Sequence, residues 1–181
     1  MSILDIFRTK KKLDKIGLAR VLTYWFKENN KFIKDIDRTF TKLGLNIYSF
    51  DRNKLINQLT YFDMWLTEIN CQGAFKDSKK LKLYLDFFYN MVWETMFSDK
   101  IDLESYLSEI SNIYSGYSKA LNLSIKKKNN LFLAQEFYKN VTGKYPKDTS
   151  IDWDIKLTIF ISGEMECVCN SLGTILKEYR I

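Results

Sequence analysis

Histidine is absent from the 181 residues of this sequence, and its absence excludes several classes of active site. A Ser-His-Asp triad, a Cys-His pair and a zinc site with histidine ligands all need an imidazole ring. So does the Glu-x-x-His motif that holds metal in helical carboxylate proteins. These catalytic and metal-binding designs are therefore closed to this chain.

Turn-forming residues are also scarce, with one proline (Pro146) and seven glycines in the whole chain. An all-β protein needs a turn about every 8 to 12 residues, so this composition argues against one. Glycine-rich nucleotide-binding motifs are missing as well. The pair Gly143-Lys144 has Tyr138 and Tyr145 where a phosphate-binding loop needs glycine and a hydroxyl residue. We therefore expect no catalytic residues, no cofactor, no metal site and no enzymatic activity.

Long apolar segments are lacking too. No window approaches the roughly 18 consecutive apolar residues of a membrane-spanning helix, and no secretory signal is evident. Residues 1–12 form a short amphipathic segment with a lysine triplet, for which docking onto the protein or fraying is favoured over contact with an anionic membrane. An odd number of cysteines, three, is typical of reduced thiols in the cytoplasm, which is the expected location.

What the chain does contain is apolar surface in a helical pattern. Hydrophobic residues make up 46% of the sequence and aromatic residues 15%, enough to form a core. Apolar positions recur at spacings of three and four along nearly the whole length. The sequence predicts an all-α protein: one domain over residues 1–181, an antiparallel bundle of six to eight helices with a long C-terminal helix.

Capping residues indicate where the helices begin and end. N-cap residues precede three of the apolar repeats: Asp51, Asp77 or Ser78, and Asp102. Gly44 and Gly143 are placed to end two helices. The pair Asn29-Asn30 predicts a break between a helix that starts near residue 13 and a second one that reaches residue 43.

The segment 153–161 is ambiguous between helix and strand. Trp153, Ile155, Leu157, Ile159 and Ile161 alternate with mostly polar residues, as in a half-buried strand. At a period of 3.6 the same segment joins an apolar stripe that continues to residue 179. A strand needs a partner strand, and the chain offers only a loosely strand-like one at 45–50. We therefore expect helix, with the strand left as the alternative.

Two groups of chemically active side chains lie in that C-terminal stretch. Cys167 and Cys169 are two residues apart, so on a helix they diverge and cannot share one metal ion; buried structural cysteine is the favoured interpretation. Glu164 lies on the apolar stripe, at its edge or beside a functional cavity, and a structural ion pair is the favoured role.

Positive charge is concentrated in the first third of the chain. The net charge is +6, whereas residues 1–60 alone carry 13 Lys and Arg against 6 Asp and Glu, which is +7. Only five of the 28 cations are arginine, the residue suited to bidentate recognition of phosphates and bases. The sequence is therefore weak evidence for specific nucleic-acid binding.

We expect a non-enzymatic cytosolic protein that binds a protein partner, of the kind found among small bacterial or phage regulatory and immunity proteins. The candidate interaction surface combines three lysines with two aromatic residues: Lys27, Lys31, Lys34, Trp25 and Tyr89. The alternative is a basic adaptor whose N-terminal third contacts nucleic acid or an anionic membrane surface.

A salt series separates these two functions. We predict only weak, non-specific binding of DNA or RNA at physiological salt, with Kd no tighter than roughly 10⁻⁶ to 10⁻⁴ M, because acidic residues interrupt the basic surface. Fluorescence anisotropy with labelled oligonucleotides measures it. Sub-micromolar binding at about 150 mM salt that is weakened by charge reversal at Lys27, Lys31 and Lys34 would instead favour the adaptor.

Overall fold

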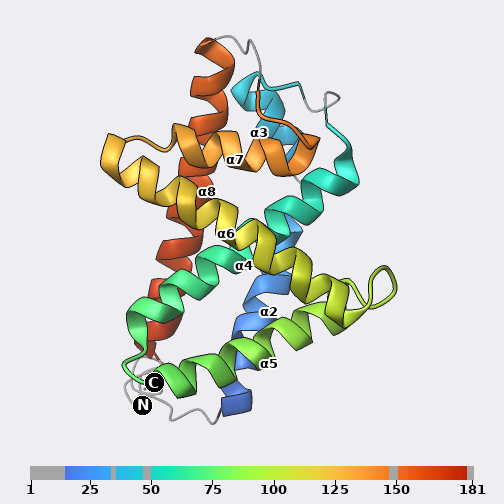
Figure 1. The fold of residues 1–181 in the computed structure, drawn as a ribbon, viewed down its shortest axis with the longest axis vertical. Helices are drawn as coiled ribbons and strands as arrows, with labels where there is room; N and C mark the ends of the chain where they lie inside the picture. The colour runs from blue at the N-terminus through green and yellow to red at the C-terminus, as the bar shows by residue number, and fades with distance from the viewer. Residues whose placement is uncertain (1–14, 34–35, 47–49, 147–150, 179–181) are drawn as a thin grey trace, which may run out of the picture.

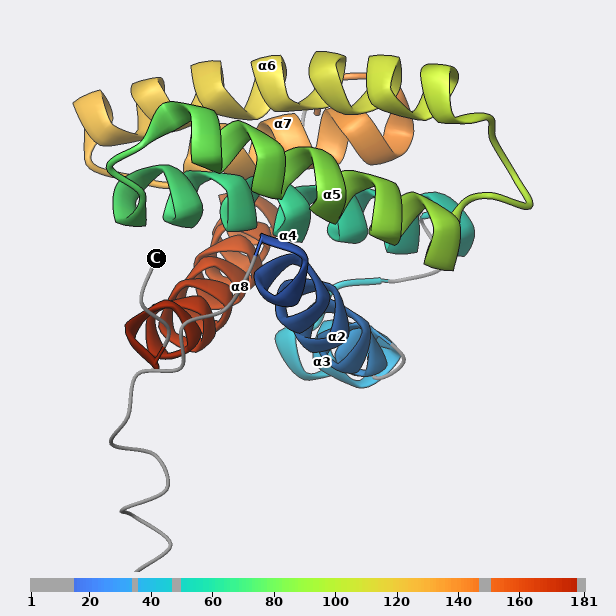
Figure 2. The same ribbon diagram turned by 90° about the horizontal axis from the view of Figure 1, so that it is seen from below.

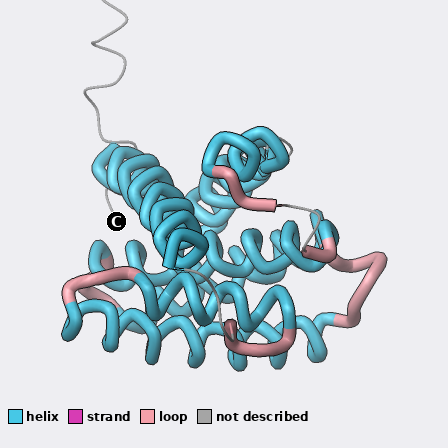
Figure 3. The backbone as a smooth tube through the Cα atoms, turned by 90° about the horizontal axis from the view of Figure 1, so that it is seen from above, coloured by secondary structure: helices cyan, strands magenta, loops and turns pink. Residues whose placement is uncertain are grey.

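Helices account for nearly all of the backbone in the computed structural model, which describes residues 15–33, 36–46, 50–146 and 151–178. Those ranges hold seven helices: α2 (Lys15–Ile33), α3 (Ile36–Leu43), α4 (Arg52–Ala74), α5 (Ser78–Met96), α6 (Leu103–Lys127), α7 (Leu131–Thr142) and α8 (Ile151–Glu178). No strand occurs among these residues (Figure 3). The predicted all-α class is confirmed.

The ambiguous C-terminal segment is helical. Helix α8 runs for 28 residues and includes all of 153–161 as well as Gly163. Its alternating isoleucines explain the strand-like pattern, since Leu157 and Ile161 are buried while Ile155 and Ile159 are exposed. Over so short a stretch the apolar spacing expected for a strand resembles the spacing expected for a helix. Because the described residues contain no partner strand, the segment forms a helix.

One predicted boundary was wrong. Helix α2 continues through Asn29 and Asn30 to Ile33, so the expected break at the two asparagines does not occur. Asparagine is only modestly unfavourable inside a helix, unlike proline or glycine, and the helix around it is able to continue. As a result Lys27 and Lys31 lie four residues apart on one helix.

The predicted N-caps are confirmed. Asp51 Oδ1 accepts hydrogen bonds from the backbone N–H of Asn53 (2.9 Å) and of Lys54 (3.1 Å) at the start of α4. Asp77, rather than Ser78, caps α5 in the same way. Asp102 Oδ1 accepts from Ser105 N–H at 2.9 Å at the start of α6. Each carboxylate satisfies N–H groups that have no partner within the helix.

Helix α4 lies at the centre of the molecule. It contacts α2, α5, α6, α7 and α8, and every side chain from Gln58 to Thr67 is buried. A helix that is buried on all faces needs neighbours on all faces. Figure 2 shows them: α5, α6 and α7 lie toward one side of α4, and α2 and α8 lie toward the other.

The neighbours of α4 meet in one aromatic core. Phe62 of α4 contacts Tyr117 of α6 and Phe137 of α7 edge to face, with ring centroids 5.0 Å and 6.1 Å apart. Trp65 packs against the same Tyr117 ring at 5.2 Å. The cluster of buried residues to which these belong includes side chains from all seven helices.

None of the helices described has the length and hydrophobicity needed to cross a membrane.

The aromatic core predicts a large loss of stability on truncation at its centre. We expect Phe62→Ala to lower the free energy of unfolding by about 3 to 5 kcal/mol, because the cavity forms where α4, α6 and α7 meet. Phe87→Ala, on the partly exposed face of α5, is the matched control and should cost far less. Urea denaturation measures both, and equal losses would contradict this account of the core.

Candidate functional site

The predicted interaction surface falls on α2 and α5, two helices that pack together (Figure 1). Lys27 is exposed on α2, and Trp25 is half-buried and packs against the core. The side chain of Lys31 and all of Lys34 lie outside the described residues. Of the three lysines in the predicted interaction surface, the structure thus describes only the side chain of Lys27, and their role in binding stays a prediction.

Tyr89 is half-buried on α5 and is held by polar and aromatic contacts. Its hydroxyl donates to Glu68 Oε2 of α4, and its ring lies 5.8 Å from Phe88 and 6.2 Å from Tyr114, between centroids. Burial, and then the negative charge of Glu68, raise the pKa of Tyr89. Much of this side chain is therefore committed to the contact of α4, α5 and α6, and only part of its surface is available to a partner.

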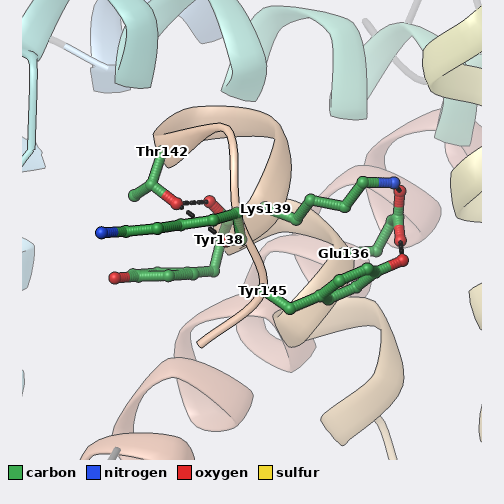
Figure 4. Close-up of polar contacts among 6 residues, drawn as sticks. Glu136, Tyr138, Lys139, Thr142 and Tyr145 are labelled. Atoms are coloured by element: carbon green, nitrogen blue, oxygen red, sulfur yellow. Dashed lines mark hydrogen bonds and ion pairs between the residues drawn. The ribbon is translucent and has the colours of Figure 1, made fainter. Parts of the chain in front are cut away.

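A pocket of about 630 Å³ opens between α6 and α7, with Glu136 among its lining residues. Glu136 is only 5% exposed, and both of its oxygens have donors (Figure 4). Oε1 accepts from Lys139 Nζ at 2.8 Å, and Oε2 accepts from the Tyr145 hydroxyl at 2.7 Å. A buried carboxylate without such partners is strongly unfavourable, so these two contacts let Glu136 stay at this position.

Gly116 of α6 makes room for this carboxylate. A Cβ atom at Gly116 would overlap Glu136 Oε1 and lie 3.1 Å from Glu136 Cδ. The missing side chain lets the glutamate of α7 reach the surface of α6. Any larger residue would push the two helices apart or turn Glu136 out of the pocket.

The connection that follows α7 brings Tyr145 back to the pocket. Gly143 adopts a left-handed conformation, with φ of 81°, and ends the helix. The Thr142 hydroxyl lies 2.9 Å from the carbonyl oxygen of Tyr138 and 3.0 Å from that of Lys144, which fixes the turn (Figure 4). Tyr145 then folds over the last turn of α7, where Lys139 Nζ lies 5.0 Å from its ring centroid.

The Glu136 carboxylate also acts on the acidity of its two donors. Hydrogen bonds to Glu136 raise the pKa of Lys139 and the pKa of Tyr145. Both groups therefore keep their protons at neutral pH and act as donors. The pocket presents an ammonium group, a phenol and nearby amides to a molecule that enters it.

A second unusual feature is a buried carboxyl pair between α4 and α8. Asp63 is 4% exposed and lies within hydrogen-bonding reach of Glu164. Burial, and then the charge of Glu164, raise the pKa of Asp63 well above its usual range, and burial raises that of Glu164. No N–H or O–H group donates to Asp63 Oδ1. Burial and the neighbouring acid thus both favour the protonated form of Asp63.

The carboxyl pair joins α8 to α4, with Asp63 buried and Glu164 half-buried. The sequence predicts a structural role for Glu164 in a pair with Lys or Tyr, whereas the neighbouring group is a second acid, Asp63. The sequence offered a signal that we missed: Asp63 is the only charged residue in the mainly apolar run Tyr61–Leu66. A carboxyl among such residues is a candidate for burial, which raises its pKa.

The cysteines are less uniform than expected. Cys71 is buried, and burial raises the pKa of its thiol to about 12. Cys169 is half-buried, and Cys167 is exposed on α8, so the expectation of buried structural cysteine was wrong for Cys167. Residues two apart on a helix point away from one another, which explains the difference. Among the residues described, no three Cys, Asp or Glu side chains gather in a way that would hold a metal ion.

A third feature is a shallow apolar groove beside the start of α7, which we call the α7–α8 groove. It has a volume of about 400 Å³, and its lining residues are Asn129, Leu131, Asp154, Ile155, Thr158 and Ile159. Ile155 and Ile159 are each 53% exposed. They are four residues apart on α8 and so lie on the same side of the helix.

Comparison with protein-family models, with curated proteins and with solved structures finds no match for this chain. The function of this chain therefore has to be inferred from its pocket, its groove and its carboxyl pair.

The buried carboxyl pair predicts an unusual pH dependence. The folded-state pKa of Asp63 lies above its ordinary value of 3.8, so above about pH 4 the folded protein holds a proton that the unfolded chain releases. The free energy of unfolding should then fall as pH rises, by up to about 1.4 kcal/mol per pH unit, until Asp63 ionises.

The variant Asp63→Asn isolates this effect, since an amide is neutral at every pH and still donates to Glu164. We expect it to be more stable than the wild type at pH 8 and to show a flatter pH profile. Asp86→Asn, which removes an exposed carboxylate from α5, is the matched control. Urea denaturation from pH 4 to pH 8 gives the profiles, and parallel curves for wild type and Asp63→Asn would contradict the assignment.

Proposed function

We propose that this chain is a non-enzymatic, cytosolic binding protein whose α7–α8 groove receives an acidic amphipathic helix of a protein partner. The observation that carries the proposal is the pair Ile155 and Ile159, each half-exposed beside a concave, mainly apolar surface. Apolar side chains one helical turn apart are the usual anchor points for a helix lying in a groove.

Charge around the groove supports an acidic partner. Lys126, Lys127 and Lys128 directly precede Asn129, which lines the groove, and all three are exposed. None of them forms an ion pair with a residue that the structure describes. Asp154 also lines the groove, but three lysines outweigh it. A helix with apolar residues on one side and acidic residues on its flank would match both features.

We further propose that the helices act as one domain, arranged as a bundle around α4. The shared core, to which all seven helices contribute, supports this proposal. It makes the groove a rigid surface, because α8 is fixed to α4 and to α7 rather than free to move. A preformed surface binds with a smaller entropic penalty than a flexible one.

Site-specific crosslinking tests the proposal directly. A photoreactive phenylalanine analogue is placed at Thr158, inside the groove, and at exposed Asn170 on the same helix as a control. Crosslinked segments from cells of the source organism are then sequenced by mass spectrometry. We expect Thr158, and not Asn170, to capture an acidic segment with apolar residues spaced three or four apart.

A second copy of this chain, a basic segment or equal capture at both positions would contradict the proposal. For the captured segment, Ile159→Ser should weaken binding about tenfold or more, since an anchor side chain is worth about 1.5 kcal/mol. Leu107→Ser, at an exposed leucine of α6 outside the groove, is the matched control. Fluorescence anisotropy with a labelled peptide measures both affinities.

A further inference from the structure

The pocket between α6 and α7 is lined by one stripe from each helix. On α6 the lining residues follow the three- and four-residue spacing of a single face: Asn112, Ser115, Gly116, Lys119, Ala120 and Leu123. On α7 they do so again: Phe132, Gln135, Glu136 and Lys139. Its volume of about 630 Å³ is in the range of sites for small organic molecules, roughly 300 to 1,000 Å³.

The pocket is apolar at one end and polar at the other. Helices α6 and α7 are joined by a short turn at 128–130, so the end of α6 meets the start of α7. Leu123 and Phe132 therefore lie at the end of the pocket near this turn. Asn112 and Lys139 are further from the turn along their helices and so lie toward the opposite end, and Tyr145 returns from the loop after α7 to contact Glu136.

The pocket carries a net positive charge. Lys139 is balanced by Glu136, with which it forms an ion pair at 2.8 Å. Lys119 forms no ion pair with any residue that the structure describes, yet it lines the same pocket. The sum of these three groups is one positive charge, flanked by the hydroxyl and amide side chains of Ser115 and Gln135.

We infer that the α6–α7 pocket binds a small organic monoanion, a carboxylate attached to an aromatic or aliphatic body. The carboxylate is placed beside Lys119, where Ser115 and Gln135 supply further donors. The apolar body lies against Leu123 and Phe132. Glu136 does not bind the ligand; it fixes Lys139 and Tyr145 at the wall and keeps a dianion from being favoured.

Leu123 supports this orientation. Its side chain is 44% exposed, and it lines the pocket together with Ala120 and Phe132. Covering such an apolar side chain removes its surface from water, which is favourable. A ligand body over Leu123 and Phe132 buries this surface. A purely inorganic anion would leave it in water, so the apolar end argues for an organic acid.

The test uses 1-naphthaleneacetate and its neutral amide, 1-naphthaleneacetamide, which differ in charge and hardly in shape. Each is titrated into the isotope-labelled full chain and followed by two-dimensional amide NMR. We expect the acid to bind with Kd on the order of 1 mM or tighter and the amide at least about fivefold more weakly. The shifted resonances should include those of Gly116 and Lys119.

Three variants locate the site. Lys119→Gln should weaken binding of the acid about fivefold and leave that of the amide unchanged, because only the charge contact is lost. Lys126→Gln removes the same charge outside the pocket and should change neither. Ser115→Trp fills the pocket from an exposed position of α6 and should abolish binding of both, while the dispersion of the NMR spectrum shows that the variant is folded.

Equal affinities for acid and amide would overturn the inference, as would equal effects of Lys119→Gln and Lys126→Gln. Shifts confined to Ile155 and Ile159 would place the probe in the α7–α8 groove and overturn it as well. So would the absence of any shift at about 10 mM probe, a concentration that detects even poor ligands of this size.

Discussion

The enclosure of α4 is the constraint on which the rest of the molecule depends. Ten consecutive residues, from Gln58 to Thr67, are buried, so every face of this helix must be covered by another element. Helices α5, α6 and α7 cover one side, and α2 and α8 cover the other. The hairpin of α6 and α7 and the long α8 are therefore placed by what α4 requires, and the pocket and the groove lie on their outer surfaces.

The same constraint sets the electrostatics of the interior. An acid in the middle of α4 has no water around it, and it meets a second acid on α8 rather than a cation. Burial and the neighbouring acid both raise the pKa of Asp63, which favours its neutral form in this place. At Glu136 the solution is different: that acid is held by a lysine and a tyrosine from its own helix and the turn that follows. Two buried acids thus have two environments, and only the second faces an open pocket.

Helix positions followed from the sequence because caps and periodicity are local. Asp51, Asp77 and Asp102 act on the three residues after them, and the stripe on α8 outweighed its strand-like start. Contacts between residues far apart in the chain could not be predicted from such local patterns. The contact between Asp63 and Glu164 joins residues about a hundred positions apart, and the role of Gly116 depends on a glutamate from the next helix. The lysines and aromatic residues named from sequence alone are conspicuous in composition, whereas the pocket is formed by ordinary residues that the hairpin brings together.

The position of α8 in the chain has a consequence for synthesis. Helix α4 is synthesised about 100 residues before α8, which covers part of its second side, is complete. During this interval the face of α4 that will meet α8 lacks this neighbour. The contacts of the α6–α7 hairpin are local in sequence, whereas closure of α8 over α4 depends on contacts of large sequence separation, the kind that slow folding.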